Sequence, residues 1–211
     1  MQESNKTALI LFAKEPQPGR VKTRLIPKLG EQGACDLYRN MLLLQLERFN
    51  KFPDCSFSLH ISPDKSSAFA TDLKQRYGIK IEQQYGDGLG ERMFQSLSQV
   101  LKYHHKAILF GADCPFIDES VMQAAIEALE QVSLVFVPAE DGGYMLIGAR
   151  QIDPTVFNHI DWSTEQVMQQ TRQQIERLSW SYKELSPLAD IDRVEDLALL
   201  KNTPLVLNSY E

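Results

Sequence analysis

Residues 7–28 read TALILFAKEPQPGRVKTRLIPK, in which an apolar run passes directly into a loop rich in proline, glycine and cations. The segment Thr7–Ala13 has no charge and no turn residue, which is typical of a central strand covered on both faces of a sheet. The run is too short to span a membrane, and no signal-peptide cleavage region accompanies it. We therefore predict a buried first strand with the loop Lys14–Lys28 at its carboxyl end.

Further apolar runs alternate with segments of helical spacing along the rest of the chain. We predict strands over Cys55–Ser62, Ile79–Gln84, Lys106–Gly111, Ser133–Val137 and Tyr144–Gly148. We predict helices over Glu31–Asn50, Ser66–Tyr77, Glu91–Tyr103, Asp118–Gln131, the polar stretch after Ser163 (with a capping box at Ser163–Gln166) and Val194–Leu200. This alternation favours parallel pairing in an open sheet with helices on both faces.

The composition indicates one globular domain over residues 1–211. Hydrophobic residues make up 43% of the chain and charged residues 24%, which argues against disorder. The net charge of −6 disfavours a nucleic-acid partner, because binding to a phosphate backbone relies on a basic surface. The three cysteines are odd in number and widely spaced, so neither a zinc cluster nor a disulfide framework is expected. These features favour the cytoplasm, and nothing indicates a membrane partner.

The loop after the first strand concentrates positive charge in an otherwise acidic protein. A loop of cations and backbone N–H groups is a common way to hold a polyphosphate, and prolines and glycine would fix the loop's path. The P-loop and dinucleotide-binding patterns are both absent, and a solvated basic loop is the alternative interpretation. The candidate phosphate-binding residues are Lys14, Gly19, Arg20, Lys22, Thr23, Arg24 and Lys28.

Asp113 follows a buried strand directly, and Pro115 makes the turn after it rigid. Because ligands of open α/β sheets bind beyond the carboxyl ends of the strands, a carboxylate there suits Mg²⁺ or Mn²⁺ held together with substrate phosphates. The alternative is an aspartate that caps a helix or stabilises a turn. The neighbouring Cys114 has no histidine at a helpful spacing, which disfavours a nucleophilic thiol.

Three further segments carry acidic residues or glycines at predicted loops. The acidic pair Glu140 and Asp141 precedes two glycines, as in a turn that approaches a ligand or in an ordinary hairpin. Asp190 and Asp192 would supply a second metal ligand. The glycine loop before the helix Glu91–Tyr103 suits a base, ribose or acceptor contact, or merely a tight turn; its candidates are Asp87, Gly88, Gly90 and Arg92.

Six motifs in this order resemble one bacterial family: AKEPQPGRVKTRL, LGERM, GADCP, PAEDGGYMLIG, DWST and LADIDRVEDL. The family is that of the GT-A-type, nucleotide-diphospho-sugar transferase-like proteins known as radical-SAM/selenodomain-associated transferases, which are related to molybdenum-cofactor and phospholactate guanylyltransferases. The resemblance implies a Rossmann-like GT-A fold, a three-layer α/β/α arrangement with a mostly parallel mixed sheet. It also implies a nucleotide over the first loop and a divalent cation on Asp113, with Asp192 as second ligand and Asp190 beside it. The LxAGGxSxRxGxxK loop of the guanylyltransferases is absent, so the base is not carried over.

We therefore expect a metal-dependent transferase whose ligands are a nucleotide or nucleotide-sugar and a small-molecule acceptor. The favoured hypothesis is nucleotidyl transfer from an NTP to a phosphorylated or hydroxyl acceptor, with Arg20, Lys22, Asp113 and Asp141 as catalytic candidates. The first alternative is a glycosyltransferase that uses a nucleotide-sugar donor, with Asp141 or Glu140 as base. The second is a non-catalytic nucleotide-binding protein.

Overall fold

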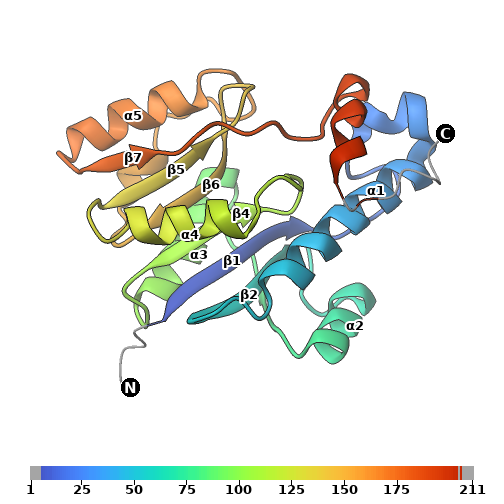
Figure 1. Ribbon diagram of the computed structural model, residues 1–211, viewed down its shortest axis with the longest axis horizontal. Coiled ribbons are helices and arrows are strands. Elements are labelled where there is room, and N and C mark those ends of the chain that lie inside the picture. Colours follow the sequence, from blue (N-terminus) through green and yellow to red (C-terminus); the bar gives the residue numbers. More distant parts are fainter. Residues whose placement is uncertain (1–5, 204, 206–211) are drawn as a thin grey trace.

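The structure, a computed structural model, describes residues 6–203 and 205 (Figure 1). Within these residues one sheet of seven strands has the order β3-β2-β1-β4-β6-β5-β7. The strands are β1 (Thr7–Lys14), β2 (Cys55–Ser62), β3 (Lys80–Gln83), β4 (Ala107–Gly111), β5 (Leu134–Pro138), β6 (Tyr144–Ala149) and β7 (Tyr182–Glu184). The first strand therefore lies inside the sheet, as its unbroken apolar run predicts.

The sheet is mixed because one strand runs against the others. Strand β1 pairs in parallel with β2 and β4, β2 with β3, and β5 with β7. Strand β6 is antiparallel to both β4 and β5, since only a short turn connects it to β5. A connection that short permits a hairpin but no helical crossover. The mostly parallel mixed sheet that the family resemblance implies is thereby confirmed.

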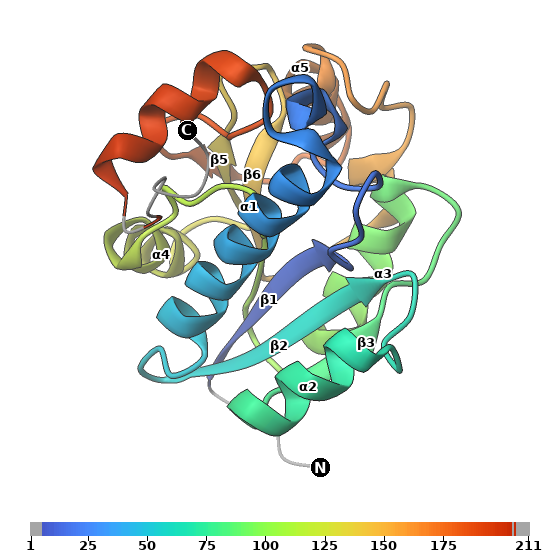
Figure 2. The same cartoon turned by 90° about the vertical axis from the view of Figure 1, so that its right-hand side faces the viewer.

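Helices cover both faces of the sheet. The α-helices are α1 (Ile26–Phe49), α2 (Ala68–Tyr77), α3 (Leu89–Leu101), α4 (Glu119–Ala128) and α5 (Val167–Arg177). Short 3₁₀ helices are η1 (Thr23–Leu25), η2 (Pro154–Phe157) and η3 (Val194–Asn202). Buried side chains of α1, α2 and α4 form one core with the sheet, and those of α3, α5 and η2 form a second core. Figure 2 shows α1 in front of the sheet. This is the three-layer α/β/α architecture.

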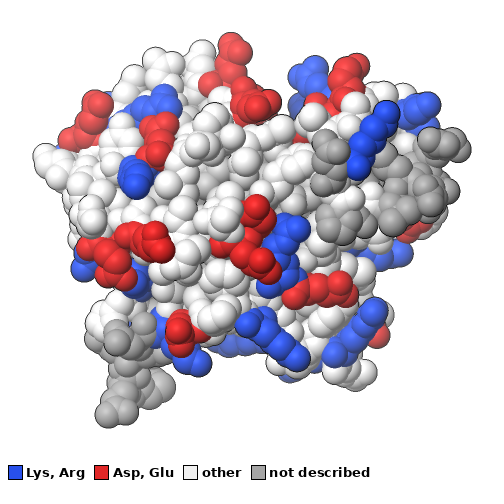
Figure 3. Space-filling model, viewed as in Figure 1, with Lys and Arg blue, Asp and Glu red and all other residues white. Residues whose placement is uncertain are grey.

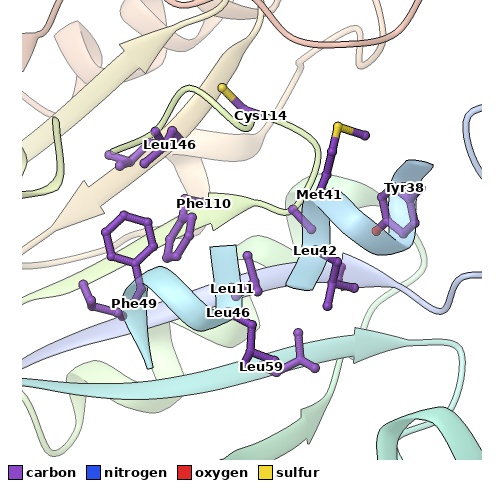
Figure 4. Close-up of a cluster of buried hydrophobic side chains, with 14 of the residues drawn as sticks. Leu11, Tyr38, Met41, Leu42, Leu46, Phe49, Leu59, Phe110, Cys114 and Leu146 are labelled. Carbon is purple, nitrogen blue, oxygen red and sulfur yellow. The ribbon is translucent and has the colours of Figure 1, made fainter. Parts of the chain in front are cut away.

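The larger core packs α1 against the middle of the sheet (Figure 4). Phe49 of α1 makes an edge-on contact with Phe110 of β4, with ring centroids 5.2 Å apart. Leu11 of β1 and Leu46 of α1 are completely buried beside them. Burying one such side chain stabilises the fold by about 1.5–3 kcal/mol. The carboxyl ends of β1 and β4 are therefore held firmly, and the loops that follow start from fixed positions.

The structure confirms one predicted helix start and corrects another. Helix α1 spans Ile26–Phe49, but its backbone breaks at Gly30 (φ 71°, ψ 169°), a conformation that favours glycine. The continuous helix therefore starts at residue 31, as predicted, after one short turn. The capping box at Ser163–Gln166 is wrong: α5 begins at Val167, and Ser163 has a left-handed φ of 67°. The reason is tertiary, because Met168 N donates to Gly142 O at 2.9 Å and ties the start of α5 to the β5–β6 turn.

On one face of the molecule the charged side chains are interspersed. On the face shown in Figure 3, Lys and Arg side chains lie in small groups beside Asp and Glu side chains rather than in one continuous basic area.

Among residues 6–203 and 205, no helix has the length and apolar character needed to cross a bilayer.

Candidate functional site

A pocket of about 770 Å³ lies at the carboxyl edge of the sheet. The loop after β1, the loop before α3 and the turn after β4 all line it. Strand β6 contributes its first residues, Tyr144–Ile147, because it runs antiparallel and begins where its neighbours end. The loops that sequence analysis singled out after β1 and β4 therefore meet at one place. This is the position at which open α/β sheets bind ligands.

The cationic loop forms one wall of this pocket. Lys14, Arg20 and Arg24 line the pocket, and all three residues are exposed. A second pocket of about 510 Å³ shares the residues Lys14, Arg20, Val21, Thr23, Gln84 and Arg92 with the first, and Gly19 lines only this second one. Lys28 lies in the first turn of α1 and lines neither pocket. The structure thus gathers every candidate of this loop except Lys28 around two adjoining cavities.

Lys22 faces acidic residues from two distant parts of the chain. Its Nζ donates to Asp113 Oδ2 at 3.1 Å and lies 3.5 Å from Asp192 Oδ1. Arg24 Nη1 contacts the other carboxylate oxygen of Asp192. The Lys22 side chain is only 5% exposed, whereas that of Arg24 is 61% exposed. Lys22 is therefore embedded between two of the predicted metal ligands.

Contacts close to each residue fix the positions of the Asp113 and Asp192 carboxylates. Gly111 ends β4, and a Cβ on it would lie 2.8 Å from Asp113 Oδ1, so the glycine leaves room for the carboxylate to turn toward Lys22. The neighbouring Cys114 donates its thiol to Ala189 O at 3.4 Å, which joins this turn to the segment that carries Asp192. Asp196 accepts from the backbone N–H of Asp192 at 3.0 Å. Both carboxylates are thus fixed by their own backbone surroundings.

Charge pairing dominates the electrostatics of this cluster. The ammonium of Lys22 holds the pKa of Asp113 below its usual range. Burial opposes the charge on Lys22, yet the attraction of Asp113 and Asp192 keeps the Lys22 pKa above its ordinary value. Burial, with the nearby negative charge of Asp113, raises the pKa of Asp190 to about 6 despite the opposing effect of Lys22. Four ionisable groups therefore share one small volume.

The donor set suits a hard divalent cation. Asp113 and Asp192 direct carboxylate oxygens at one point, and a positively charged nitrogen already lies there. Mg²⁺ commonly binds through one or two carboxylates and completes its octahedron with water and substrate phosphates. In the described part of the chain there is no cluster of three or more His, Cys, Asp or Glu side chains arranged to hold a metal. A cation here would thus take two protein ligands and rely on phosphates for the rest.

Asp190 and Asp141 lie near this cluster but do not line the pocket. Asp190 is half-buried, and the charges of Lys22 and Asp113 both act on it. Asp141 is exposed on the β5–β6 turn, where its Oδ1 accepts from Gly143 N at 3.1 Å. Glu140 is exposed beside it, and the segment forms a hairpin turn. The roles predicted for Asp190, Asp141 and Glu140 stay predictions.

Of the four candidates in the glycine loop before α3, two line the pocket and two do not. Asp87 and Arg92 line the pocket, and Arg92 Nε donates to Gly86 O at 2.8 Å. Gly88 precedes α3 as its N-cap residue and lines neither pocket. Gly90 is buried, and a Cβ there would lie 2.7 Å from the Trp162 ring. Packing against Trp162 therefore requires the glycine, and ligand contact by Gly88 and Gly90 stays a prediction.

Several residues of the pocket carry little or no signal in the sequence. Tyr38 Oη accepts from Lys14 N at 2.9 Å, and buried Gln84 donates to Ala13 O at 2.8 Å, so both hold the start of the cationic loop. Tyr144 also lines the pocket, as does Ser163 of the DWST motif, a segment that the sequence indicates for packing or for an acceptor pocket. Tyr38 matches the apolar spacing of α1 and therefore carries no sequence signal. Tyr144 belongs to the EDGGY segment, in which the acids and glycines are the stronger signal.

Cys114 is completely buried at the end of the β4 turn. Burial raises the pKa of its thiol to about 12. Because a thiol must ionise to act as a nucleophile, this environment opposes such a role at neutral pH. The geometry agrees with the sequence interpretation, which disfavours a catalytic cysteine.

The comparisons with known proteins agree with this fold. The family model described as "Uncharacterized protein conserved in bacteria (DUF2064)" matches residues 45–164, more than half of the chain, and the chain belongs to this family. The crystal structure of a protein from Desulfovibrio desulfuricans G20, provisionally assigned as a nucleotide-diphospho-sugar transferase, is similar with a TM-score of 0.87 and 28% identity. That match covers 100% of this chain and 93% of the other.

More distant structures share the fold at lower identity. The 4-diphosphocytidyl-2C-methyl-D-erythritol synthase of Anaerococcus prevotii DSM 20548 has a TM-score of 0.63 and 13% identity over 93% of this chain and 94% of its own. A CMP:2-keto-3-deoxy-manno-octonic acid synthetase in complex with CTP has a TM-score of 0.57 and 10% identity over 93% and 97%. No curated protein sequence matches the chain significantly. The fold is that of nucleotide-diphospho-sugar transferases and cytidylyltransferases.

Proposed function

We propose that this member of the DUF2064 family is a single-domain, metal-dependent transferase that moves a nucleotidyl group from an NTP to a small phosphorylated or hydroxyl acceptor. The observation that carries the proposal is the meeting of an exposed cationic loop with the carboxylates of Asp113 and Asp192 in one pocket. The fold shared with cytidylyltransferases supports it. The resemblance at 28% identity to a protein assigned as a transferase supports the enzyme class.

Each part of the pocket has a task in this reaction. Lys14, Arg20 and Arg24 would bind the triphosphate and hold it for an in-line attack. The acceptor oxygen attacks the α-phosphorus, the bond to the bridging oxygen of the β-phosphate breaks, and pyrophosphate leaves. A divalent cation held by Asp113 and Asp192 would neutralise charge on the phosphate oxygens. Where the acceptor is a hydroxyl, Asp141, on the β5–β6 turn outside the pocket lining, would accept its proton.

A glycosyltransferase is the second candidate, and the assignment of the Desulfovibrio desulfuricans protein favours it. In that reaction the same loop and cation would bind the diphosphate of a nucleotide-sugar, and the sugar would move. Asp141 or Glu140, on the exposed β5–β6 turn, would then act as base. A non-catalytic nucleotide-binding protein is the third hypothesis. It predicts nucleotide binding without release of pyrophosphate or nucleoside diphosphate.

Two parts of the proposal come from the sequence alone. An association with radical-SAM or selenodomain proteins is supported only by the six shared motifs. A cytoplasmic location is supported by the odd number and wide spacing of the cysteines Cys35, Cys55 and Cys114.

A ligand screen followed by product analysis tests the function. Thermal unfolding is measured with each of the four NTPs and with UDP- and GDP-sugars, in the presence of Mg²⁺ or Mn²⁺, because a ligand of the native state raises the melting temperature. Pyrophosphate released from an NTP in the presence of an acceptor supports nucleotidyl transfer. Nucleoside diphosphate released from a nucleotide-sugar supports glycosyl transfer instead. If no nucleotide shifts the melting temperature, both enzymatic hypotheses are contradicted.

A further inference from the structure

Lys22 differs from the other cations of its loop in what it faces. Lys14 and Arg20 are exposed at the pocket wall, whereas the Lys22 side chain is 5% exposed and lies 3.1 Å from Asp113 and 3.5 Å from Asp192. Arg24 engages the second oxygen of Asp192. The ammonium of Lys22 therefore lies between the same two carboxylates that the proposed function assigns to a divalent cation.

The backbone around Lys22 keeps its Cα in place. Lys22 has φ 45° and ψ 45°, a left-handed conformation that costs about 1–3 kcal/mol in a residue other than glycine and persists only where the surroundings enforce it. Val21 and Leu25 on either side of it are buried. The backbone is thus fixed, while the side chain has four rotatable methylene groups and lines the pocket.

The charges explain why the ammonium belongs there in the free protein. Asp113, Asp190 and Asp192 act on one another and on Lys22, so two close carboxylates without a cation would repel each other strongly. A lysine side chain supplies that cation without any ligand. A divalent cation between the carboxylates would instead meet the Lys22 ammonium within contact distance, and the two positive charges would repel.

We propose that Lys22 is an internal counter-ion of the Asp113–Asp192 pair and competes with the divalent cation for it. A free divalent cation therefore binds this pair weakly, because the Lys22 ammonium must leave first. The inference rests on the proposed function, since that function supplies the cation. It adds that Lys22 sets the affinity for the metal, a role separate from contact with phosphate.

The test measures Mn²⁺ binding to the protein without nucleotide, by calorimetry and by the paramagnetic resonance signal of free Mn²⁺. Lys22→Met should bind Mn²⁺ about tenfold more tightly than the unmodified protein, which is within the usual range of site-to-site coupling. Arg20→Met is the matched control: it removes one positive charge from the same pocket wall but from a residue that lines the pocket without an ion pair to either carboxylate. Its Mn²⁺ affinity should change less than about threefold.

Two further variants separate the loss of the Lys22 charge from a loss of folding. Lys22→Gln keeps much of the side-chain length and a hydrogen-bond donor, and it should show the same gain if Lys22→Met folds poorly. Adding Asp113→Asn to either variant should abolish the gain, because it removes one ligand. Equal or weaker Mn²⁺ affinity in both Lys22 variants overturns the inference, as does an equal gain in Arg20→Met. None of these outcomes depends on nucleotide binding, so failure of the proposed function is detected separately by the nucleotide screen.

Discussion

The two walls of the pocket are built in opposite ways. The wall formed by the loop after β1 presents exposed cations, Lys14 and Arg20, on a loop whose path is set by prolines and glycine. The opposite wall, from the β4 turn and the segment before η3, carries half-buried carboxylates that are fixed by backbone contacts and by Lys22. Exposed charges contribute binding energy for a mobile polyphosphate, whereas embedded charges determine geometry. We therefore expect changes in the second wall to have the larger effects.

The largest effect is expected from Asp113→Asn. Removing this carboxylate charge takes away one proposed cation ligand and leaves the embedded Lys22 without its closest partner. We expect kcat/KM for pyrophosphate release to fall by about 10³-fold, comparable to the loss of one strong transition-state interaction. Asp72→Asn, at an exposed position of α2, is the control and should leave kcat/KM unchanged. A loss below tenfold in Asp113→Asn would place the chemistry elsewhere.

The second prediction compares how much stability is lost when one glycine of the β5–β6 turn, Gly142, and one of the cationic loop, Gly19, are each replaced by alanine. Gly142 has φ 92°, and a Cβ on it would lie 2.1 Å from the Glu165 carbonyl oxygen, so Gly142→Ala requires the backbone to move. We expect the free energy of unfolding in urea to fall by about 3 kcal/mol or more. Gly19 in the cationic loop has φ 75° but only ordinary contacts at 3.4 Å, to the Glu31 side chain. Gly19→Ala should therefore cost about 1 kcal/mol. Equal costs would contradict the difference in packing between these two segments.

The third prediction concerns a buried histidine of β2, the strand that pairs with β1, and its contact with α3. His60 of β2 is 1% exposed, its Nδ1 lies 3.0 Å from Ser96 Oγ, and burial lowers its pKa to about 4. In the unfolded state the pKa of the His60 side chain is near 6.5, so the unfolded chain binds this proton more readily than the folded protein does. The free energy of unfolding is therefore highest above pH 6.5 and declines as the pH falls toward 4. The free energy of unfolding should drop by about 2 kcal/mol from pH 7 to pH 5 through this group.

Unfolding in urea at several pH values checks this effect. His60→Gln should flatten the decline between pH 7 and pH 5 relative to the unmodified protein. His159→Gln, at an exposed position, is the control for the replacement of a histidine as such. If His60→Gln keeps the full decline, other titrating groups are responsible for it.

The smallest effect is expected in the exposed wall. Arg20→Met removes one exposed cation from both pockets. A hydrogen bond to a charged group contributes about 1.5 kcal/mol at the lower end of its range, so nucleotide affinity should fall about tenfold. The loss should shrink as salt is added, because exposed charges are screened. Lys28→Met should change the affinity less than about twofold, since Lys28 lines neither pocket. Calorimetric titration at two salt concentrations measures both, and a larger effect of Lys28→Met would show that the phosphates extend beyond the pockets.

Much of the fold is readable from local patterns. Strand β2 begins and ends at the predicted residues, Cys55 and Ser62, and β1 extends one residue beyond the predicted Ala13. Strand β1 is a nearly continuous apolar run that ends at Lys14, whereas β2 alternates apolar residues with Ser and His and ends before Pro63. Both patterns are typical of strands, and in both a charge or a proline marks the end. The start of α5 was not predictable, because its Ser163–Gln166 signal competes with a backbone contact to Gly142 far away in sequence. Gly90 likewise carries no sign that Trp162 fills the space above it.

The sequence by itself determined which strands are buried and which loops carry charge and glycine, because hydrophobic patterning and turn chemistry act over a few neighbouring residues. Only the tertiary structure decided that Lys22 meets Asp113, 91 residues away, and that Arg24 meets Asp192, 168 residues away. These two ion pairs depend on the order of the strands, which places the ends of β1 and β4 side by side. They also depend on backbone contacts such as that of Cys114 with Ala189, which draw the last acidic segment to the same edge.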